Sequence, residues 1–395
     1  MSGALDGITI LDFTRFQQGT FATLLLADMG AEVWKIEQPG GDPGRRLGVH
    51  GDGFSAYFES LNRNKRGIVL DLRKSEAIEA VHRMAEKVDV VAENFRPGVM
   101  DRLGIGFEAL RCRNPGLIYA EGSMWGLQGP RAHHPGYDNI AQAAGGMMMA
   151  TRQNEEAPHA PLMGTADQTG GMILAYGVLA ALVARCRTGS GQRVDASLYG
   201  SQIALQGIQF ARALYSVPLN PPGVASSSFS YRAFCGDGAW IAFGYLTGDF
   251  WPKLCRALDL EWMMTDPRFA EPAERGRHNH DLVEVLDAQV ATRQSDEWME
   301  RMAEADVPCT VVQNYHDIAE DAQAEANSYI LSYPTSRWGE AHAQGFPATL
   351  SETPASFRHE APATPGVHSS AILRNAGFSD EESAALFACG AVQGV

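Results

Sequence analysis

Apolar residues in the first third of the chain follow two alternating patterns. Short apolar runs are typical of strands buried on both faces, and they occur at residues 8–13, 32–37, 67–72, 89–94 and 117–122. Between them, residues 21–29 and 75–87 carry apolar side chains at helical spacing. Strands separated by single helices predict βαβ units and an open, mostly parallel sheet. The expected fold class is therefore α/β.

The pattern changes after residue 215, and this change predicts two domains. Residues 1–215 are expected to form the N-terminal part of a Rossmann-like large domain, and the Pro- and Ser-rich residues 216–230 a linker. Residues 231–312 combine strand patterns with amphipathic helices, which predicts a smaller α+β domain. Residues 313–395 are expected to be a return linker and the C-terminal part of the large domain, with Ser379 capping a final helix.

The loops that follow the predicted strands are the places to look for a ligand site, because ligands bind at the carboxyl edge of such sheets. These loops are rich in Gly, Pro, Gln and Arg. None contains the GxGxxG or GxxxxGK[ST] pattern. A nicotinamide-dependent oxidoreductase is therefore a disfavoured alternative, although the alternating start of the chain suits it.

Charge and cysteine content bear on the binding partners, the location and metal binding of the protein. The 395 residues carry a net charge of −15, which disfavours binding to nucleic acid or to an anionic membrane. The N-terminus lacks the features of a signal peptide. Six scattered cysteines form no CxxC pair, which predicts free thiols, a cytoplasmic location and no metal site.

Asp167 is the residue with the most suggestive surroundings. It lies in the glycine-rich sequence PLMGTADQTGG, directly before a long apolar stretch at residues 172–187 that predicts a helix. A carboxylate at a helix start is commonly a cap. It is also able to act as a nucleophile toward an acyl group, with backbone N–H groups of Gly170-Gly171 as expected oxyanion donors. The sequence around Asp167 alone leaves both interpretations open.

The chain as a whole resembles the class III CoA-transferase family, also called the CaiB/BaiF family. The resemblance covers nearly the whole length and depends on a series of motifs in a fixed order. They are LDFT at 11–14, LADMGAEVWKIE at 26–37, PGGD at 39–42, NKR at 64–66, ENFRPG at 93–98, GYDNIAQ at 136–142, AD at 166–167, RTGSGQ at 187–192 and GVH at 366–368.

The resemblance implies an enzyme that moves CoA from an acyl-CoA thioester to a free carboxylic acid. Asp167 is then the catalytic nucleophile, which passes through an aspartyl mixed anhydride and an aspartyl-CoA thioester. The substrates are acyl-CoA and a small carboxylic acid, and no cofactor is permanently bound. The residues that the resemblance places at the CoA site are Gln17, Leu70, Arg73, Asn94, Phe95, Arg102 and Tyr137.

The resemblance also implies an interlocked homodimer, in which each chain threads the central opening of the other. This sequence departs from some family members at Gln38, where they carry an arginine. α-Methylacyl-CoA racemases, which resemble the same family, use a histidine where this chain has Tyr137. A tyrosine is a weak general base at neutral pH. His133 and His134 stand nearby, so a racemase-like isomerase stays an alternative.

Overall fold

The computed structural model covers most of the chain. It describes residues 3–49, 53, 55–151, 157–215, 230–244, 250–336 and 338–394. The chain divides into two compact units. The first unit comprises residues 1–152, 157–207 and 325–395, and the second consists mainly of residues 208–324. The predicted linker at 216–230 lies, apart from Ser230, outside the described residues, so the predicted domain boundaries stay a prediction.

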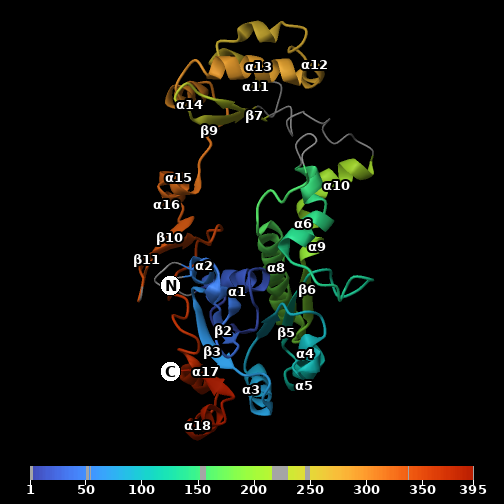
Figure 1. Ribbon diagram of the computed structural model, residues 1–395, viewed down its shortest axis with the longest axis vertical. Coiled ribbons are helices and arrows are strands. Elements are labelled where there is room, and N and C mark those ends of the chain that lie inside the picture. Colours follow the sequence, from blue (N-terminus) through green and yellow to red (C-terminus); the bar gives the residue numbers. More distant parts are fainter. Residues whose placement is uncertain are drawn as a thin grey trace. The chain divides into compact units, whose positions relative to one another are not determined.

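A seven-stranded sheet forms the centre of the first unit (Figure 1). Its strands run in the spatial order β12-β3-β2-β1-β4-β5-β6, and β1 to β6 are parallel while β12 pairs antiparallel with β3. The bounds are β1 Thr9–Asp12, β2 Glu32–Glu37, β3 Lys65–Leu70, β4 Val90–Glu93, β5 Ile118–Ser123, β6 Arg193–Ser197 and β12 Val392–Gln393. The predicted α/β class with a mostly parallel sheet is confirmed.

Alternate residues of each strand enter the cores on opposite faces of the sheet, as the period of a strand requires. Ile10 packs with α1 (Gln18–Asp28) and α8 (Thr165–Thr188), whereas Leu11 packs with α3 (Ser75–Ala85), α5 (Phe107–Arg113) and α17 (Ser369–Asn375). The first unit is therefore a three-layer α/β/α structure. The apolar runs in the sequence reflect this burial on both faces.

The other elements of the first unit lie on or beside these layers. They are the 3₁₀ turn η1 Pro43–Arg46 and the helices α2 Ala56–Asn62, α4 Val99–Arg102, α6 Asp138–Ala144, α7 Met147–Ala150, α9 Leu198–Leu205 and α18 Asp380–Ala388, with the hairpin β10 Ile330–Thr335 and β11 Gly339–Gln344. Ser379 caps α18 in a capping box with Glu382, which confirms the predicted cap.

The second unit has its own antiparallel sheet and its own core. Trp298 and Phe269 are among its fully buried side chains. Its elements are β7 Ser230–Phe234, β8 Trp240–Gly244 and β9 Cys309–Val311, with α11 Phe250–Ala257, η2 Glu261–Met264, α12 Pro272–Arg277, α13 Asn279–Val290, α14 Ser295–Glu304 and α15 Tyr315–Ala319. Two further helices, α10 Gly207–Leu214 and α16 Ala322–Ala326, lie where the two units meet along the chain.

Helix α8 is long and apolar enough to span a membrane by length and composition, and 39% of its most apolar window is buried. It is the one such helix in the described part of the chain. Its inner face, including Leu174 and Val178, packs with strand residues such as Ile118 and Ala120. These contacts are those of a core helix of an α/β unit.

Candidate active site

The strand order reverses between β1 and β4, and the loops that leave these two strands lie at this switch point. Open α/β sheets bind ligands there, outside the carboxyl ends of the strands. The Asn94 side chain links the two loops: it accepts the Arg15 N–H at 2.7 Å and donates to the Arg15 carbonyl at 2.8 Å. Glu93 accepts the Phe95 N–H at 2.6 Å, and the Arg15 guanidinium lies 4.7 Å from the centre of the Phe95 ring. Asn94 therefore fixes Arg15 and Phe95 relative to each other.

A buried ionic network supports the loop after β1. The Asp12 carboxylate accepts the hydroxyl of Thr23 at 2.7 Å and the Lys65 ammonium at 3.2 Å. Lys35 donates to the Thr14 carbonyl at 2.8 Å. Burial opposes the charge on Asp12, but the two lysines and the hydroxyl groups of Thr14 and Thr23 together lower the Asp12 pKa, while burial lowers the pKa of Lys65 to about 8. Each member has its partners, as buried charges require.

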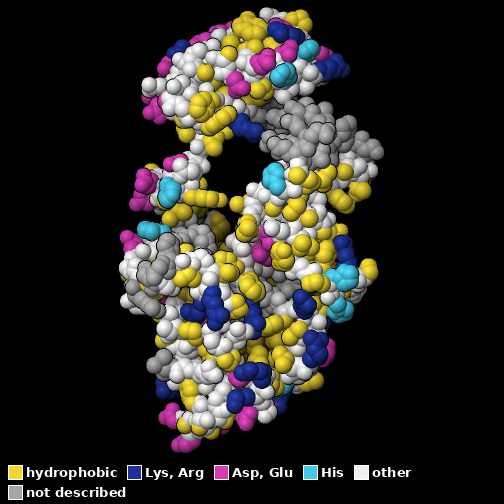
Figure 2. Space-filling view, viewed as in Figure 1, with side chains coloured by type: hydrophobic (Ala, Val, Ile, Leu, Met, Phe, Trp, Pro, Cys, Tyr) yellow, Lys and Arg dark blue, Asp and Glu magenta, His cyan; other side chains and the backbone are white. Residues whose placement is uncertain are grey.

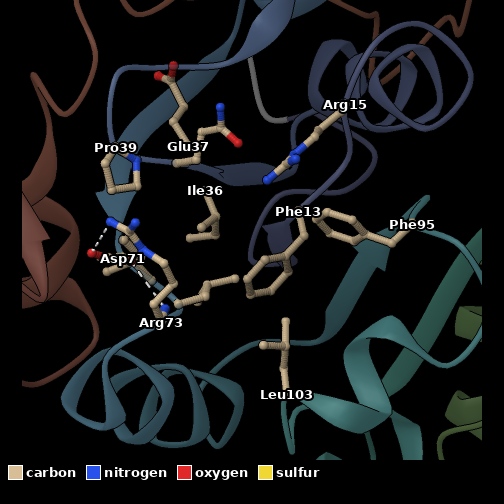
Figure 3. Close-up of a pocket in the computed structure, with 12 residues that line it drawn as sticks. Phe13, Arg15, Ile36, Glu37, Pro39, Asp71, Arg73, Phe95 and Leu103 are labelled. Carbon is tan, nitrogen blue, oxygen red and sulfur yellow. Dashed lines mark hydrogen bonds and ion pairs between the residues drawn. The ribbon is translucent and has the colours of Figure 1, made fainter.

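A first pocket lies at the ends of β2 and β3 (Figure 3). Its lining residues are Phe13, Arg15, Ile36, Glu37, Gln38, Pro39, Leu70, Asp71, Leu72, Arg73, Phe95 and Leu103. The Arg73 side chain is exposed and pairs with Asp71 through two hydrogen bonds of 2.7 and 2.8 Å. These bonds lower the pKa of Asp71 to about 2. Figure 3 shows the Arg15 guanidinium directed toward the middle of the pocket.

The second pocket adjoins the first through Phe95, which lines both. Its lining residues are Phe16, Gln17, Gln18, Asn94, Phe95, Arg96, Pro97, Gly122, Ser123, Met124, Ala132, His134, Pro135, Gly136, Tyr137, Ile140, Asp167 and Leu198. The Phe16 backbone is left-handed (φ 57°), an unfavourable conformation for a bulky residue.

Figure 2 shows several Lys and Arg side chains on this face of the first unit, over the region of β2, β3 and α4.

The two pockets gather most of the residues that the sequence predicted for the site. Leu70, Arg73 and Phe95 line the first pocket, and Gln17, Asn94, Phe95, Tyr137 and Asp167 line the second. Arg102 ends α4 with an exposed side chain and lines neither pocket. Its role at the CoA site stays a prediction, as do the roles of the others.

Asp167 does not lie in a glycine-rich turn, and it does not cap the helix. Helix α8 begins at Thr165, with Gly164 in the left-handed conformation as its N-cap, so Asp167 is in the first helical turn. Gly170 and Gly171 lie inside the helix, where backbone N–H groups bond to the preceding turn. They are therefore unsuitable as the oxyanion donors that the sequence suggested.

The glycines of α8 instead permit a close approach to α1. A Cβ atom on Gly171 would stand 2.6 Å from the Gln18 carbonyl oxygen, a backbone atom that cannot rotate away. A Cβ atom on Gly164 would stand 2.7 Å from the side-chain nitrogen of Gln17. The Gln17 amide therefore lies against Gly164 at the start of α8, and Gln17 lines the second pocket together with Asp167.

The carboxylate of Asp138 occupies the N-terminus of α8. It accepts the N–H groups of Gly164 at 2.9 Å, Ala166 at 2.7 Å and Asp167 at 3.2 Å. The side chain of Asp167 is half-buried and lines the second pocket. Burial raises the pKa of Asp167 to about 7, and the negative charge of Asp138 adds to this rise. Asp167 thus titrates near neutral pH, as suits a reactive carboxylate.

Sequence reasoning missed Asp138 and Arg15 as members of the site. Asp138 was visible as the third residue of the GYDNIAQ motif, but only Tyr137 in that motif was singled out. Of the two neighbouring histidines, His134 lines the second pocket. Within the described ranges no group of three or more His, Cys, Asp or Glu side chains is arranged to hold a metal ion.

Comparison with known proteins identifies the family of the chain. Residues 5–369 match CoA-transferase family III, and the chain belongs to this family. It is similar to the acetyl-CoA:oxalate CoA-transferase of Acetobacter aceti, with 36% identity over 337 residues that cover 83% of this chain and 86% of the relative. It is also similar to the formyl-CoA:oxalate CoA-transferase of Escherichia coli, with 31% identity over 416 residues that cover 98% of this chain and 99% of the relative.

A solved structure of a similar protein has the same fold. The orthorhombic crystal structure of Rv3272 from Mycobacterium tuberculosis superposes with a TM-score of 0.83 and 30% identity, and the match covers 94% of this chain and 99% of that one. The protein is thus an enzyme, a class III CoA-transferase that moves CoA between acyl-CoA and carboxylic acids. The family resemblance in the sequence is confirmed.

Proposed function

We propose that Asp167 is the covalent nucleophile of CoA transfer. Its carboxylate attacks the acyl-CoA carbonyl, which breaks the C–S bond and yields an aspartyl mixed anhydride and CoA thiolate. The thiolate then attacks the aspartyl carbonyl, releases the first acid as its carboxylate and leaves an aspartyl-CoA thioester. An incoming carboxylate attacks this thioester, breaks its C–S bond and forms a second anhydride with release of CoA thiolate. CoA thiolate attacks the new acyl carbonyl, leaves as the new acyl-CoA and restores Asp167.

The observation that carries this proposal is the state of the Asp167 carboxylate. It faces the second pocket, makes no hydrogen bond to a described residue, and has a pKa of about 7. A more basic carboxylate is a stronger nucleophile, and one that is not solvated by donors needs no desolvation before it attacks. The Gln17 amide beside the first turn of α8 supports a role as a donor to the oxyanion that develops at the thioester.

The CoA nucleotide is proposed to occupy the first pocket, with the pantetheine arm passing Phe95 into the second. Arg15 lies over the Phe95 ring but forms no ion pair with a described residue, and burial lowers its pKa, so a half-buried cation faces the first pocket without a carboxylate in contact. Gln38 lines the same pocket. We propose that Arg15 supplies the phosphate contact that other family members obtain from an arginine at that position.

Arg15→Ala and Arg73→Ala are each expected to weaken CoA binding by about 1–3 kcal/mol, the range for hydrogen bonds to charged groups. Arg66→Ala is the matched control, because Arg66 is a partly buried, ion-paired arginine near the amino end of β3 rather than beyond its carboxyl end. Calorimetric titration with CoA measures all three variants. Equal affinities for the Arg15 and Arg66 variants would reject the placement of Arg15. Arg102→Ala, titrated alongside, tests the sequence-based role of Arg102.

The acids that this enzyme exchanges are proposed only as a class. The two relatives described above act on acetyl-CoA or formyl-CoA and oxalate, according to their names. A panel of acyl-CoA donors with free carboxylic acids, read by mass spectrometry, identifies the pair. New acyl-CoA formed in the panel supports transfer, and the absence of new acyl-CoA from every pair contradicts it.

A racemase-like isomerase is the second candidate, because His134 and Asp167 line the same pocket. Two acid–base groups around one α-carbon would remove and return a proton. An isomerase exchanges the α-hydrogen of a 2-methylacyl-CoA with deuterium from D₂O when no free acid is present. The transferase mechanism of Asp167 predicts no such exchange.

We propose that the enzyme is an interlocked homodimer. Helix α8 leaves the apolar side chains of Met172, Ile173, Tyr176 and Val183 exposed, and α10 exposes Ile208, Phe210 and Leu214. Apolar surfaces of this kind mark sites of association. Two interlocked chains cannot separate without unfolding, so sedimentation at nanomolar concentration is expected to show only a dimer. A folded monomer at that concentration would contradict the proposal.

A cytoplasmic location is likewise a proposal. The free state of all six cysteines supports it, since a reducing compartment keeps thiols unpaired.

A further inference from the structure

Asp138 stands at the point where α6 meets the start of α8. The N-cap residue of α8 is Gly164, which has no side chain to accept the first N–H groups of the helix. The Asp138 carboxylate accepts them instead, from a residue 26 positions earlier in the chain. Gln142 donates to the same carboxylate at 2.7 Å and to the Leu162 carbonyl at 2.8 Å. The buried carboxylate therefore accepts four N–H donors and ties α6 to the turn that carries the nucleophile.

We propose that Asp138 is a positioning residue for the CoA-transfer reaction, which holds the first turn of α8 and keeps the Asp167 carboxylate directed into the second pocket. This inference rests on the proposed role of Asp167. Asp138 acts through Asp167 in two ways. Its hydrogen bond to the Asp167 N–H fixes the backbone from which the nucleophile projects, and its charge disfavours the ionised form of Asp167.

The other ionisable groups near Asp167 come from three parts of the chain. Tyr57 on α2 is close enough for the charge of Asp167 to add to the rise that burial causes in the Tyr57 pKa. Tyr137 precedes α6, and His134 and Arg96 line the second pocket from their loops. After burial, Asp138 is the group whose charge affects the pKa of Asp167. Removing that charge therefore lowers the Asp167 pKa.

Two substitutions separate the geometry from the charge. Asp138→Asn keeps the shape of the side chain and one carbonyl oxygen, which is able to accept the N–H groups of Ala166 and Asp167. The substitution removes the charge, and it places an amide donor where the second carboxylate oxygen accepted two other donors. Asp138→Glu keeps the charge but moves it by one methylene. Both variants are expected to lower kcat at least tenfold, with the KM for acyl-CoA changed less than twofold, because the CoA pockets are left intact.

The pH dependence of kcat distinguishes the two Asp138 variants. The acid limb of kcat against pH is expected to move to lower pH in Asp138→Asn and to stay in place in Asp138→Glu. Ser379→Ala is the matched control, since it removes the cap of α18, a helix that contributes to neither pocket. It is expected to lower Tm and to leave kcat and the acid limb unchanged.

A merely structural role for Asp138 predicts lower Tm in both variants with an unmoved acid limb and unchanged kcat, and that result would overturn the proposal. If Asp138→Asn does not fold, Asp138→Glu decides through its kcat. If neither folds, Gln142→Met decides, since it removes one donor to Asp138 and is expected to lower kcat without raising KM. Hydroxylamine trapping on the unmodified enzyme keeps the two proposals distinct. Trapping at a residue other than Asp167 rejects the proposed function. Trapping at Asp167, together with an unmoved acid limb and an unchanged kcat in Asp138→Asn, rejects only the role of Asp138.

Discussion

Replacing Asp167 with Asn is expected to lower the rate of CoA transfer by roughly 10³-fold or more, because an amide cannot form the mixed anhydride. The fold should survive, since Asp138 rather than Asp167 caps α8. Asp287→Asn, at an exposed position of α13 in the second unit, is the control and should retain full activity. Transfer is measured with the acid pair identified in the substrate panel. Near-normal transfer by the Asp167 variant would remove Asp167 from the mechanism.

The same substitution is expected to stabilise the protein at pH 8. Burial raises the pKa of Asp167 to about 7 in the folded state, whereas an unfolded Asp titrates near about 4. The folded state therefore binds the extra proton, and the stability that Asp167 contributes falls as pH rises from about 4 to about 7. Asn removes this dependence. Calorimetry should show a higher Tm for the variant at pH 8, and the difference should close as pH falls toward 4. A lower Tm for the variant at pH 8 would contradict this account.

Lys65→Met is expected to lower the free energy of unfolding by about 3–5 kcal/mol, the usual cost of breaking a buried ion pair. Lys65 and Asp12 are both fully buried, and the variant leaves Asp12 with one cation fewer and the Thr20 carbonyl without its donor. This is a large share of the stability of an ordinary domain. The loop that carries Arg15 and Gln17 should also loosen, so CoA affinity should fall.

Lys253→Met is the matched control for this prediction. Lys253 forms an ion pair with Asp306 that is exposed on the second unit, and such a pair contributes under about 1 kcal/mol. Urea unfolding measures both variants. Similar losses in the two would mean that the Asp12 network does not stabilise the sheet edge as described.

The sheet was predictable from the sequence because its strands are buried on both faces and appear as continuous apolar runs. Residues 32–37 were predicted as a strand, and β2 spans Glu32–Glu37. β12 was not predicted, since its two residues show no period of their own. The start of α8 was placed too late, because Gly170 and Gly171 are poor helix formers by about 1 kcal/mol each. Packing against α1 overrides that preference, and such packing is not visible in a single sequence.

In the candidate site, too, some features were visible in the sequence and others depend on packing. Asp167, Gln17 and Asn94 were identified through motifs, and the structure brings them to one pocket. The capping of α8 by Asp138 joins residues that are 26 positions apart, and the Asn94–Arg15 link joins residues that are 79 apart. Such pairs depend on how the elements pack. The motifs therefore gave several members of the site, but not Asp138 and Arg15, whose roles follow from contacts between distant residues.

Transfer of ¹⁸O from a labelled acceptor acid tests the central claim most directly. In this mechanism the released acid carries away one oxygen of the nucleophile, and the acceptor carboxylate replaces it with one of its own when the second anhydride is cleaved at the acyl carbonyl. The enzyme is incubated with acyl-CoA and the ¹⁸O-labelled acid, then digested and mapped by mass spectrometry. The account predicts ¹⁸O in the peptide that contains Asp167, and at Asp167 itself on fragmentation. Product acyl-CoA formed without label in that residue, or with label on another carboxylate, would contradict it.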